Sequence, residues 1–330
     1  MNKTLCSNWT GFAASVPGSG HIRRGLPCQD ASCAITSPRP ALIVCDGRGS
    51  ASSSQDGAQA AIKAFQTQLA IFEPMLANIL DNDKAQESQW QQFARIMYRT
   101  LMQVKLDLSA ERGIPEKEFD FTVAFAVIGE CRIGCFQVGD GAIVLRQNGE
   151  LKTAFLPDKG EFANQTHFLR ENGEAMGKFQ AALFLSDENT GVSITSDGPE
   201  HLMFKLNEMK PGMIFDFLMD NLHDGNLCKQ DLMDYLTRQD WEKDPRGADD
   251  RSIAILSPMA YPVSSCEKNT SAEIRPLVCN PANPPEGSQT QAPCRKPAQI
   301  APPEPMPAPS PLRRFAVSII DGTRNLIKRK

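Results

Sequence analysis

The chain has 330 residues, of which 41% are hydrophobic and 22% charged, with a formal net charge of −4. The length allows one large domain or two smaller ones with a sizeable core. The acidic balance argues against a protein that coats nucleic acid, and no stretch approaches the ~20 apolar residues of a membrane span. The N-terminus lacks the apolar core of a signal peptide. We therefore expect a cytoplasmic monomer with reduced cysteines.

The first half of the chain predicts strands followed by two helices. Alternating or continuous apolar runs predict strands over 9–16, 31–36 and 41–46. Residues 56–72 predict a helix. A longer helix follows from about Asp83, a candidate N-cap, to Gly113, a candidate stop. Its apolar face repeats every three or four residues, at Trp90, Phe93, Ala94, Met97, Leu101, Val104 and Leu108.

The second half continues with strands, then helices, then one strand. Strands are predicted over 122–129, within 132–147, and over 181–186 and 192–196, and helices over 199–208, 213–222 and 229–239. A closing strand is predicted over 251–257. This segregated order predicts an α+β fold rather than a regular βαβ arrangement.

The composition changes after residue 257. Residues 258–311 contain 14 of the 24 prolines and predict an extended linker. Residues 312–330 carry a net charge of +5 and place apolar residues at helical spacing, which predicts a short basic amphipathic helix. This segment is a solvated extension, a docking peptide for a partner protein, or a helix that binds a membrane surface.

Aspartates lie at the edges of several predicted strands, in stretches of small residues: Asp30, Asp46, Asp197, Asp249 and, in a weaker case, Asp140. Each Asp-Gly pair alone is typical of a turn. Asp46 and Asp197, however, follow stretches that look fully buried. Carboxylates that converge repel one another unless a cation neutralises them, and oxygen ligands favour Mg²⁺ or Mn²⁺ over zinc. Because Gly47 has no Cβ, its carbonyl is also a candidate ligand.

The ordered motifs QD, DG, GDG, SDG and DDRS resemble those of metal-dependent protein Ser/Thr phosphatases of the protein phosphatase 2C family. GSGHIRRGLPCQDA followed by CDGRGSASSSQDGAQAA is most similar to the compact bacterial branch of that family. The resemblance covers roughly residues 9–257, so we expect residues 1–257 to form the catalytic domain. It implies an α-β-β-α sandwich: two antiparallel sheets face to face, with helices on the outer faces and a metal site at one edge between the sheets.

The resemblance implies a role for each matching residue. Asp46 would bridge two metal ions, and Gly47 would add its carbonyl to one of them. Asp197 and Asp249 would hold the other ion, and Asp30 would hold a metal-bound water. The two ions, Mg²⁺ or Mn²⁺, would lower the pKa of a shared water and clamp the phosphoryl oxygens. Phosphoryl transfer then depends mainly on positioning and charge neutralisation.

The expected phosphate contacts depart from the family pattern. Family members usually have an arginine five residues before the first aspartate, where this chain has Gly25. Arg23 and Arg24 are nearby replacements or solvated side chains. Arg48 follows Asp-Gly; it cannot act as an acid at neutral pH, but it can bind phosphate bidentately. His21 is a further candidate acid or phosphate contact, although a lone histidine is often structural.

Three more positions qualify the resemblance. Asp140 stands where some members hold a third, weaker metal ion. Gln29 replaces the more usual glutamate, and Asp250 replaces the more usual asparagine, where it would be a hydrogen-bond acceptor behind the metal ligands or a simple junction residue.

The sequence therefore predicts a phosphatase that removes phosphate from serine and threonine of protein substrates and opposes a bacterial Ser/Thr kinase. The alternative is a pseudophosphatase, in which the same fold binds phosphoproteins as a scaffold without turnover.

Overall fold

The computed structural model describes residues 9–155, 167–169, 179–187, 190–205, 208, 210–238, 241 and 245–259. The chain divides into two compact units, Met1–Glu267 and Lys268–Lys330, and all the described residues belong to the first. The predicted linker beyond residue 259 and the predicted basic segment 312–330 lie outside the described residues. Within the described ranges, no helix combines the length and the apolar character needed to cross a bilayer.

Two five-stranded antiparallel sheets form the centre of the described unit. The first has the order β1-β12-β9-β6-β7, built from Trp9–Val16, Arg251–Pro258, Gly191–Thr195, Ala142–Gln147 and Glu150–Thr153. The second has the order β2-β3-β4-β5-β8, built from Ala31–Ile35, Ala41–Gly47, Phe121–Ile128, Arg132–Val138 and Gln180–Leu185. A separate small pair joins β10 (Phe204–Lys205) and β11 (Lys210–Pro211).

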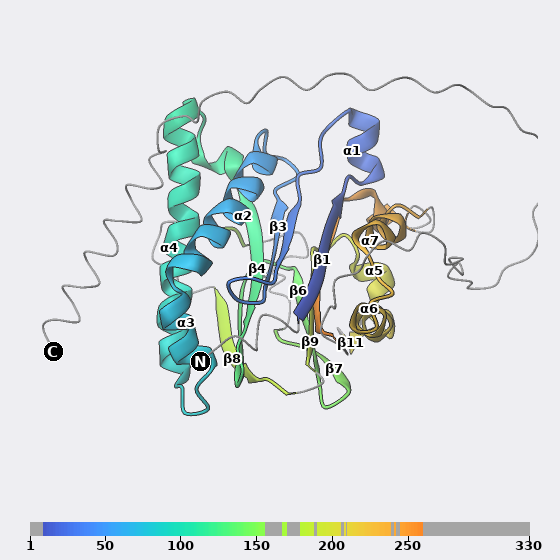
Figure 1. Cartoon of the computed structure of the whole chain (residues 1–330). Helices are drawn as coiled ribbons and strands as arrows, with labels where there is room; N and C mark the ends of the chain where they lie inside the picture. The colour runs from blue at the N-terminus through green and yellow to red at the C-terminus, as the bar shows by residue number, and fades with distance from the viewer. Residues whose placement is uncertain are drawn as a thin grey trace, which may run out of the picture. The chain divides into compact units, whose positions relative to one another are not determined.

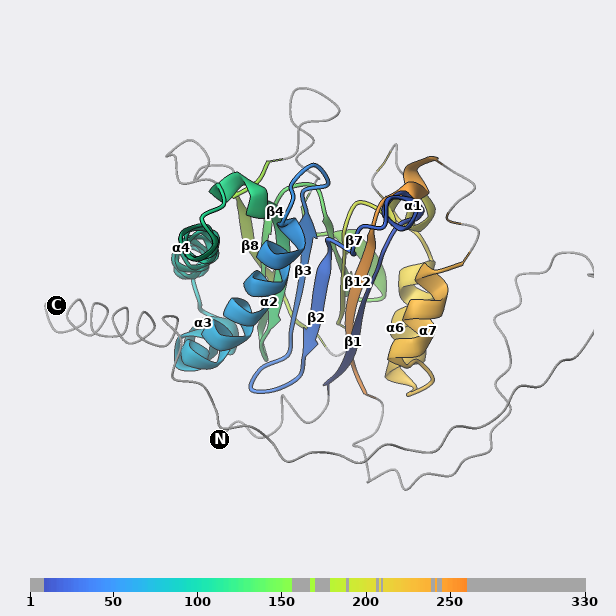
Figure 2. The ribbon, with the colours of Figure 1, turned by 90° about the horizontal axis from the view of Figure 1, so that it is seen from above.

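Helices cover the outer faces of both sheets (Figures 1 and 2). The second sheet is covered by α2 (Ser54–Ile71), α3 (Glu73–Leu80) and α4 (Glu87–Arg112). The first is covered by α5 (Glu200–Met203), α6 (Ile214–His223) and α7 (Lys229–Leu236). A six-residue helix, α1 (Ser19–Arg24), connects β1 to β2, and short 3₁₀ turns span Glu116–Phe119 and Pro245–Ala248. The predicted α-β-β-α sandwich is confirmed.

The hydrophobic core between the sheets explains why a central strand such as β3 is a continuous run of apolar residues. Leu42 and Val44 of β3 pack in this layer against Val192 and Ile194 of β9. Ile43, on the opposite face of β3, is also fully buried. Because a central strand covered on both faces has no solvent side, it is a continuous apolar run rather than an alternating one.

Several local predictions were wrong in detail. Asp83 does not cap the long helix, which begins at Glu87 behind a capping box made by Gln86 and Gln89. Gly113 does end it, with φ of 66°. The segment predicted as helix over 199–208 is helical only over α5 and then extends into β10. The helices α1 and α3 and the strand β7 were not predicted.

The Trp90 ring packs closely against the backbone of Gly134 in β5, and this contact gives the first testable prediction. Trp90 of α4 is fully buried and donates from Nε1 to the carbonyl of Cys135 at 2.8 Å. A Cβ on Gly134 would lie 2.4 Å from the Trp90 ring. Gly134→Ala should therefore destabilise the domain by about 1–3 kcal/mol, through overpacking. Urea unfolding measures this, with Gly49→Ala as the matched control because nothing lies within 4 Å of its added Cβ. Equal stabilities of the two variants would contradict the packing argument.

Candidate active site

Strand register brings Asp30 and Asp46 together. Ala31 of β2 pairs with Cys45 of β3, so Asp30, one residue before the ladder, lies beside Asp46. Side chains alternate between the faces of a strand. Asp46 therefore shares the face of Leu42 and Val44, the layer between the two sheets.

The other acids come from the facing sheet at the same ends of three strands. Thr195 of β9 pairs with Ala142 of β6 and with Ile253 of β12. Asp140 precedes β6 by two residues, Asp197 follows β9 by two and Asp249 precedes β12 by two. All five predicted acids thus gather around one end of the sandwich.

The electrostatics of this cluster are unfavourable for ionised carboxylates. Burial first, and then the charges of Asp30, Asp197, Asp249 and Asp140, raise the pKa of Asp46 well above its usual range. Burial and the charges of Asp140 and Asp249 raise the pKa of Asp197 to about 7. The Asp46 side chain acts in the opposite direction and partly offsets this rise. A cation bound among these carboxylates would remove the repulsion.

Asp30 lies near residues of the first sheet. It is 6% exposed. Burial and the charge of Asp250 raise its pKa, while the neighbouring side chains of Ser196 and Ser252 act in the opposite direction. Its Oδ2 atom is buried without a hydrogen-bond partner, and so is Oδ1 of Asp197. Such orphaned oxygens are rare in folded proteins and point to a missing ion or water.

Asp250 organises the backbone behind the acids. Its Oδ1 accepts from the Gly18 N–H at 2.8 Å, and its Oδ2 accepts from the Gln29 N–H at 2.6 Å. His21 Nδ1 lies 2.7 Å from Oδ1, and both side chains are 3% exposed. One buried carboxylate therefore ties the start of α1 and the residue before Asp30 to the start of β12. Of the two readings of Asp250, the structure supports the hydrogen-bond acceptor.

Two glycines allow this close packing. A Cβ on Gly47 would lie 2.5 Å from the carbonyl oxygen of Gln29, and one on Gly198 would lie 2.0 Å from that of Asp250. Gly47 is thus required by backbone approach, irrespective of what its carbonyl binds. Sequence reasoning explained this glycine by a turn or by metal access, and not by packing against the Gln29 backbone.

Arg48 is anchored by a buried charge pair that sequence reasoning missed. Its N–H donates to the Asp120 carbonyl at 2.9 Å, and its Nη1 lies 3.3 Å from Asp120 Oδ2. The fully buried Lys105 donates to Asp120 Oδ1 at 2.7 Å and to the Leu169 carbonyl at 2.9 Å. Asp120 directly precedes β4, so the rule that found the other acids, an aspartate at a strand edge, would also have found this one.

The other predicted phosphate contacts lie differently. Arg24 is exposed, and its Nε donates to the Gly20 carbonyl within α1 at 3.1 Å. His21 faces Asp250 rather than solvent. The contacts of the described residues therefore do not bring either side chain against Asp46.

The donor set fits a hard divalent cation, because it consists of carboxylate oxygens, two of them orphaned. Within the described ranges, no group of three or more His, Cys, Asp or Glu side chains is placed so that it could hold a metal ion. Binding would therefore require side-chain rearrangements.

Comparisons with known proteins agree with this fold. The family model described as protein phosphatase 2C matches residues 17–237. Serine/threonine-protein phosphatase 3 of Escherichia coli (strain K12) is 24% identical over 262 residues, 75% of this chain and 98% of that protein. The S. agalactiae serine/threonine phosphatase structure has a TM-score of 0.51 at 15% identity, covering 76% of this chain and 99% of its own. The catalytic domain of PstP in complex with two manganese ions has a TM-score of 0.45 at 14% identity, covering 76% and 99%.

The fold and the family match define the class as protein-serine/threonine phosphatase. The chain belongs to the protein phosphatase 2C family.

The crowded acids predict a specific pH dependence of stability. Folding raises the pKa of Asp197 to about 7, so the folded state holds its proton longer than the unfolded state does. The metal-free domain should lose stability as pH rises from about 4 to about 7. Asp197→Asn should flatten this loss and stabilise the metal-free protein at pH 8 by on the order of 1 kcal/mol. Thermal unfolding in EDTA measures both effects, and an unchanged pH profile in the variant would contradict the assignment.

The Lys105–Asp120 pair gives a second prediction for this region. Asp120→Asn leaves a buried ammonium without its main counter-charge, which should destabilise the domain by about 3–5 kcal/mol. Glu116→Gln is the matched control, because Glu116 is 27% exposed and 3.6 Å from Lys105, so its loss should change stability by less than about 1 kcal/mol. Chemical unfolding of both variants tests the difference. A larger loss for Glu116→Gln would overturn the ranking.

Proposed function

We propose that this protein hydrolyses phosphoserine and phosphothreonine on protein substrates with a water activated by two divalent ions, Mg²⁺ or Mn²⁺. The observation that carries the proposal is the gathering of Asp30, Asp46, Asp140, Asp197 and Asp249 at one end of the sandwich. There, burial and the charges of neighbouring aspartates raise the pKa values of Asp30, Asp46 and Asp197. Such an arrangement is costly for stability alone, and it is typical of a site that binds cations.

The proposed roles are those that the resemblance to the family implies. Asp46 would bridge both ions from the layer between the sheets, with the Gly47 carbonyl beside it. Asp197 and Asp249 would complete the second ion's ligands from the facing sheet, and Asp140 would add a weaker third site. When bound, the ions supply a nucleophile from water near neutral pH and neutralise phosphoryl charge.

Asp30 and Arg48 would act next to the ions. Ser196 and Ser252 lie near the Asp30 carboxylate, which would hold the attacking water. Arg48 uses Nε towards Ser50 and Nη1 towards Asp120, and a guanidinium has five N–H donors. A phosphate contact through its remaining donors is therefore compatible with its anchoring. Arg24 and His21 stay predicted phosphate contacts that would require movement of α1.

The biological setting extends the same proposal. A bacterial Ser/Thr kinase would produce the phosphorylated substrates, and the segment 312–330 would dock a partner. The alternative, a pseudophosphatase scaffold, predicts phosphopeptide binding without turnover.

Activity measurement tests the proposal directly. The purified protein should hydrolyse p-nitrophenyl phosphate and a phosphothreonine peptide in the presence of Mn²⁺, and chelation by EDTA should remove the activity. Asp46→Asn should lower kcat by at least about 10²-fold, because it removes the bridging charge. Asp224→Asn, an exposed residue at the end of α6, is the matched control and should keep full activity.

Calorimetric titration with Mn²⁺ separates the two functions. Metal binding that depends on Asp46, together with turnover, supports the enzyme. Phosphopeptide binding with neither metal binding nor turnover would instead support the scaffold.

A further inference from the structure

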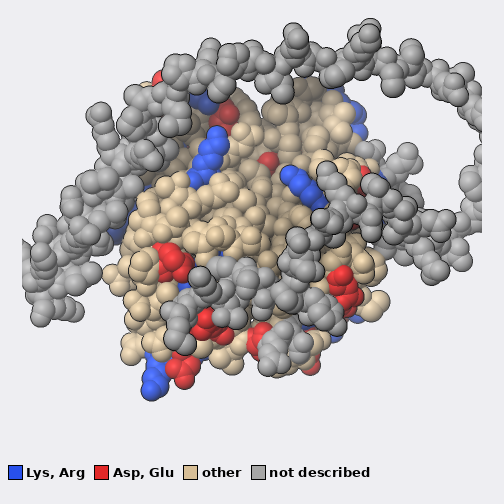
Figure 3. All heavy atoms as spheres, viewed as in Figure 1, with Lys and Arg blue, Asp and Glu red and all other residues tan. Residues whose placement is uncertain are grey.

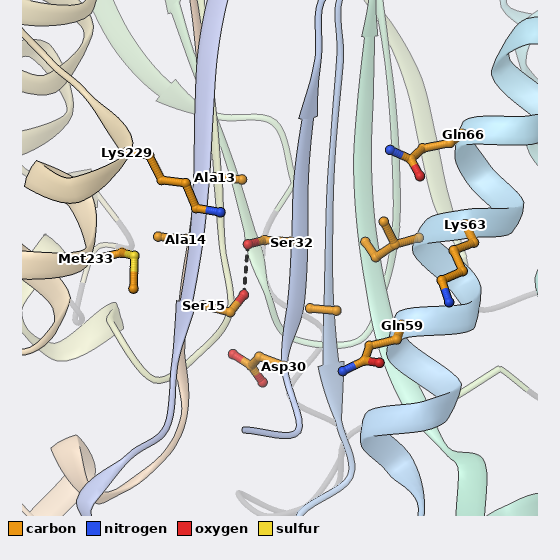
Figure 4. Close-up of a pocket in the computed structure, with 12 residues that line it drawn as sticks. Ala13, Ala14, Ser15, Asp30, Ser32, Gln59, Lys63, Gln66, Lys229 and Met233 are labelled. Carbon is orange, nitrogen blue, oxygen red and sulfur yellow. Dashed lines mark hydrogen bonds between the residues drawn. The ribbon is translucent and has the colours of Figure 1, made fainter. Parts of the chain in front are cut away.

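A groove opens where the edge strands of the two sheets face each other. It has a volume of about 470 Å³, a size typical of small-molecule sites. Edge strands β1 and β2 line it together with α2 and α7 (Figure 4). The strands contribute only small side chains here besides Asp30, namely Ala13, Ala14, Ser15, Ala31 and Ser32. These leave unfilled the space that larger residues occupy in the rest of the inter-sheet layer.

The lining strands are held together by hydroxyl groups. Ser15 Oγ and Ser32 Oγ are 2.8 Å apart, which joins β1 to β2 across the gap between the sheets. Ser252 of β12 donates to Ser15 at 2.6 Å. This part of the groove is therefore a defined polar surface rather than a separation of the sheets.

Two basic side chains stand at the groove without an acidic partner. Lys63 comes from α2 and Lys229 from the start of α7, and both are exposed. Neither forms an ion pair with any described residue, although lysines elsewhere on this acidic protein do. Figure 3 shows basic side chains on both sides of the hollow between the two halves of the molecule. Two ammonium groups that line the same concave surface favour an anion.

Polar side chains line the end of the groove away from Asp30. Gln66 Nε2 donates to the Cys33 sulfur at 3.3 Å. Figure 4 shows Gln66 on α2 and Lys229 on α7, on opposite sides of the edge strands and both towards one end of the groove, with Asp30 towards the other end. An anion avoids the Asp30 carboxylate by binding at the Lys229 end.

We propose that this groove is a binding site for a small phosphate-bearing molecule, next to the acid cluster, with which it shares Asp30. The phosphate would lie against Lys229, as a multiply charged acceptor for its N–H groups. The body of the ligand would extend along α2 past Lys63 and Gln59. Ile62 and Met233 provide apolar contacts in the same lining. The proposal does not depend on phosphatase activity.

Calorimetry on the full chain in EDTA tests the site, with AMP and inorganic phosphate as probes. Removing metal ions excludes anions from the acid cluster, because its carboxylates repel them. The wild type should bind AMP, and inorganic phosphate should compete with it. Lys63→Gln combined with Lys229→Gln should weaken AMP binding at least tenfold, since both counter-charges are lost. Lys84→Gln combined with Lys210→Gln removes two exposed lysines outside the groove and should leave binding unchanged.

The same variants separate this site from catalysis. The Lys63/Lys229 variant should keep the wild-type melting temperature and any Mn²⁺-dependent hydrolysis of p-nitrophenyl phosphate. Absence of AMP binding by the wild type would overturn the proposal. Equal AMP binding by the wild type and the Lys63/Lys229 variant would overturn it as well. Failure of phosphate to compete would show that the phosphate group is not what the groove recognises, and would overturn it too.

Discussion

Mutual repulsion among carboxylates at one end of the sandwich is the constraint around which this structure is arranged. Asp30 and Asp46 come from one sheet, and Asp140, Asp197 and Asp249 from loops of the other. Without a cation, burial and like charge raise the pKa values of several members. The group stays together because the strands that carry it are fixed by two packed sheets and a common hydrophobic layer. The stability of the folded domain therefore offsets the unfavourable free energy of holding these carboxylates close together.

The residues behind the acids show how that fixation is achieved locally. Asp250 accepts two backbone N–H groups from distant parts of the chain and faces His21. Gly47 and Gly198 let the backbones approach closely enough for this arrangement. On the other side, Lys105 and Asp120 fix the turn that carries Arg48. Buried charges on both sides are thus matched individually, whereas the central acids are not, which is the expected difference between supporting residues and a site for an ion.

Sequence reasoning recovered most of the fold because its elements have strong local signals. The fully buried β3 and β4 appear as uninterrupted apolar runs, and α4 has a clear helical repeat. Its failures also have local causes. The helix α1 spans six residues, too few for a periodic pattern, and α3 follows α2 with one residue between them. Asp83 resembled a cap, but the capping box at Gln86 begins the helix four residues later.

The candidate site was also only partly predictable from the sequence. The acids at strand edges were visible in the sequence, and their order carried the family resemblance. The positions of the His21 and Arg24 side chains could not be predicted from the sequence, because their directions depend on how α1 packs against the loop before β12. Lys105 looked like one residue of an amphipathic helix until the structure placed it against Asp120. The groove between β1 and β2 likewise has no sequence signal, since it arises from small residues on strands that do not pair.

The sequence by itself determined which residues carry charge, which segments become strands and helices, and the order of the motifs that mark the family. These properties depend on side-chain chemistry and on spacing along the chain. Only the tertiary structure decided which charges meet. Strand register set Asp30 beside Asp46, sheet packing brought Asp197 to them, and Asp250 turned His21 inward. Contacts between residues more than 100 positions apart depend on the packing of whole sheets, and no local pattern encodes them.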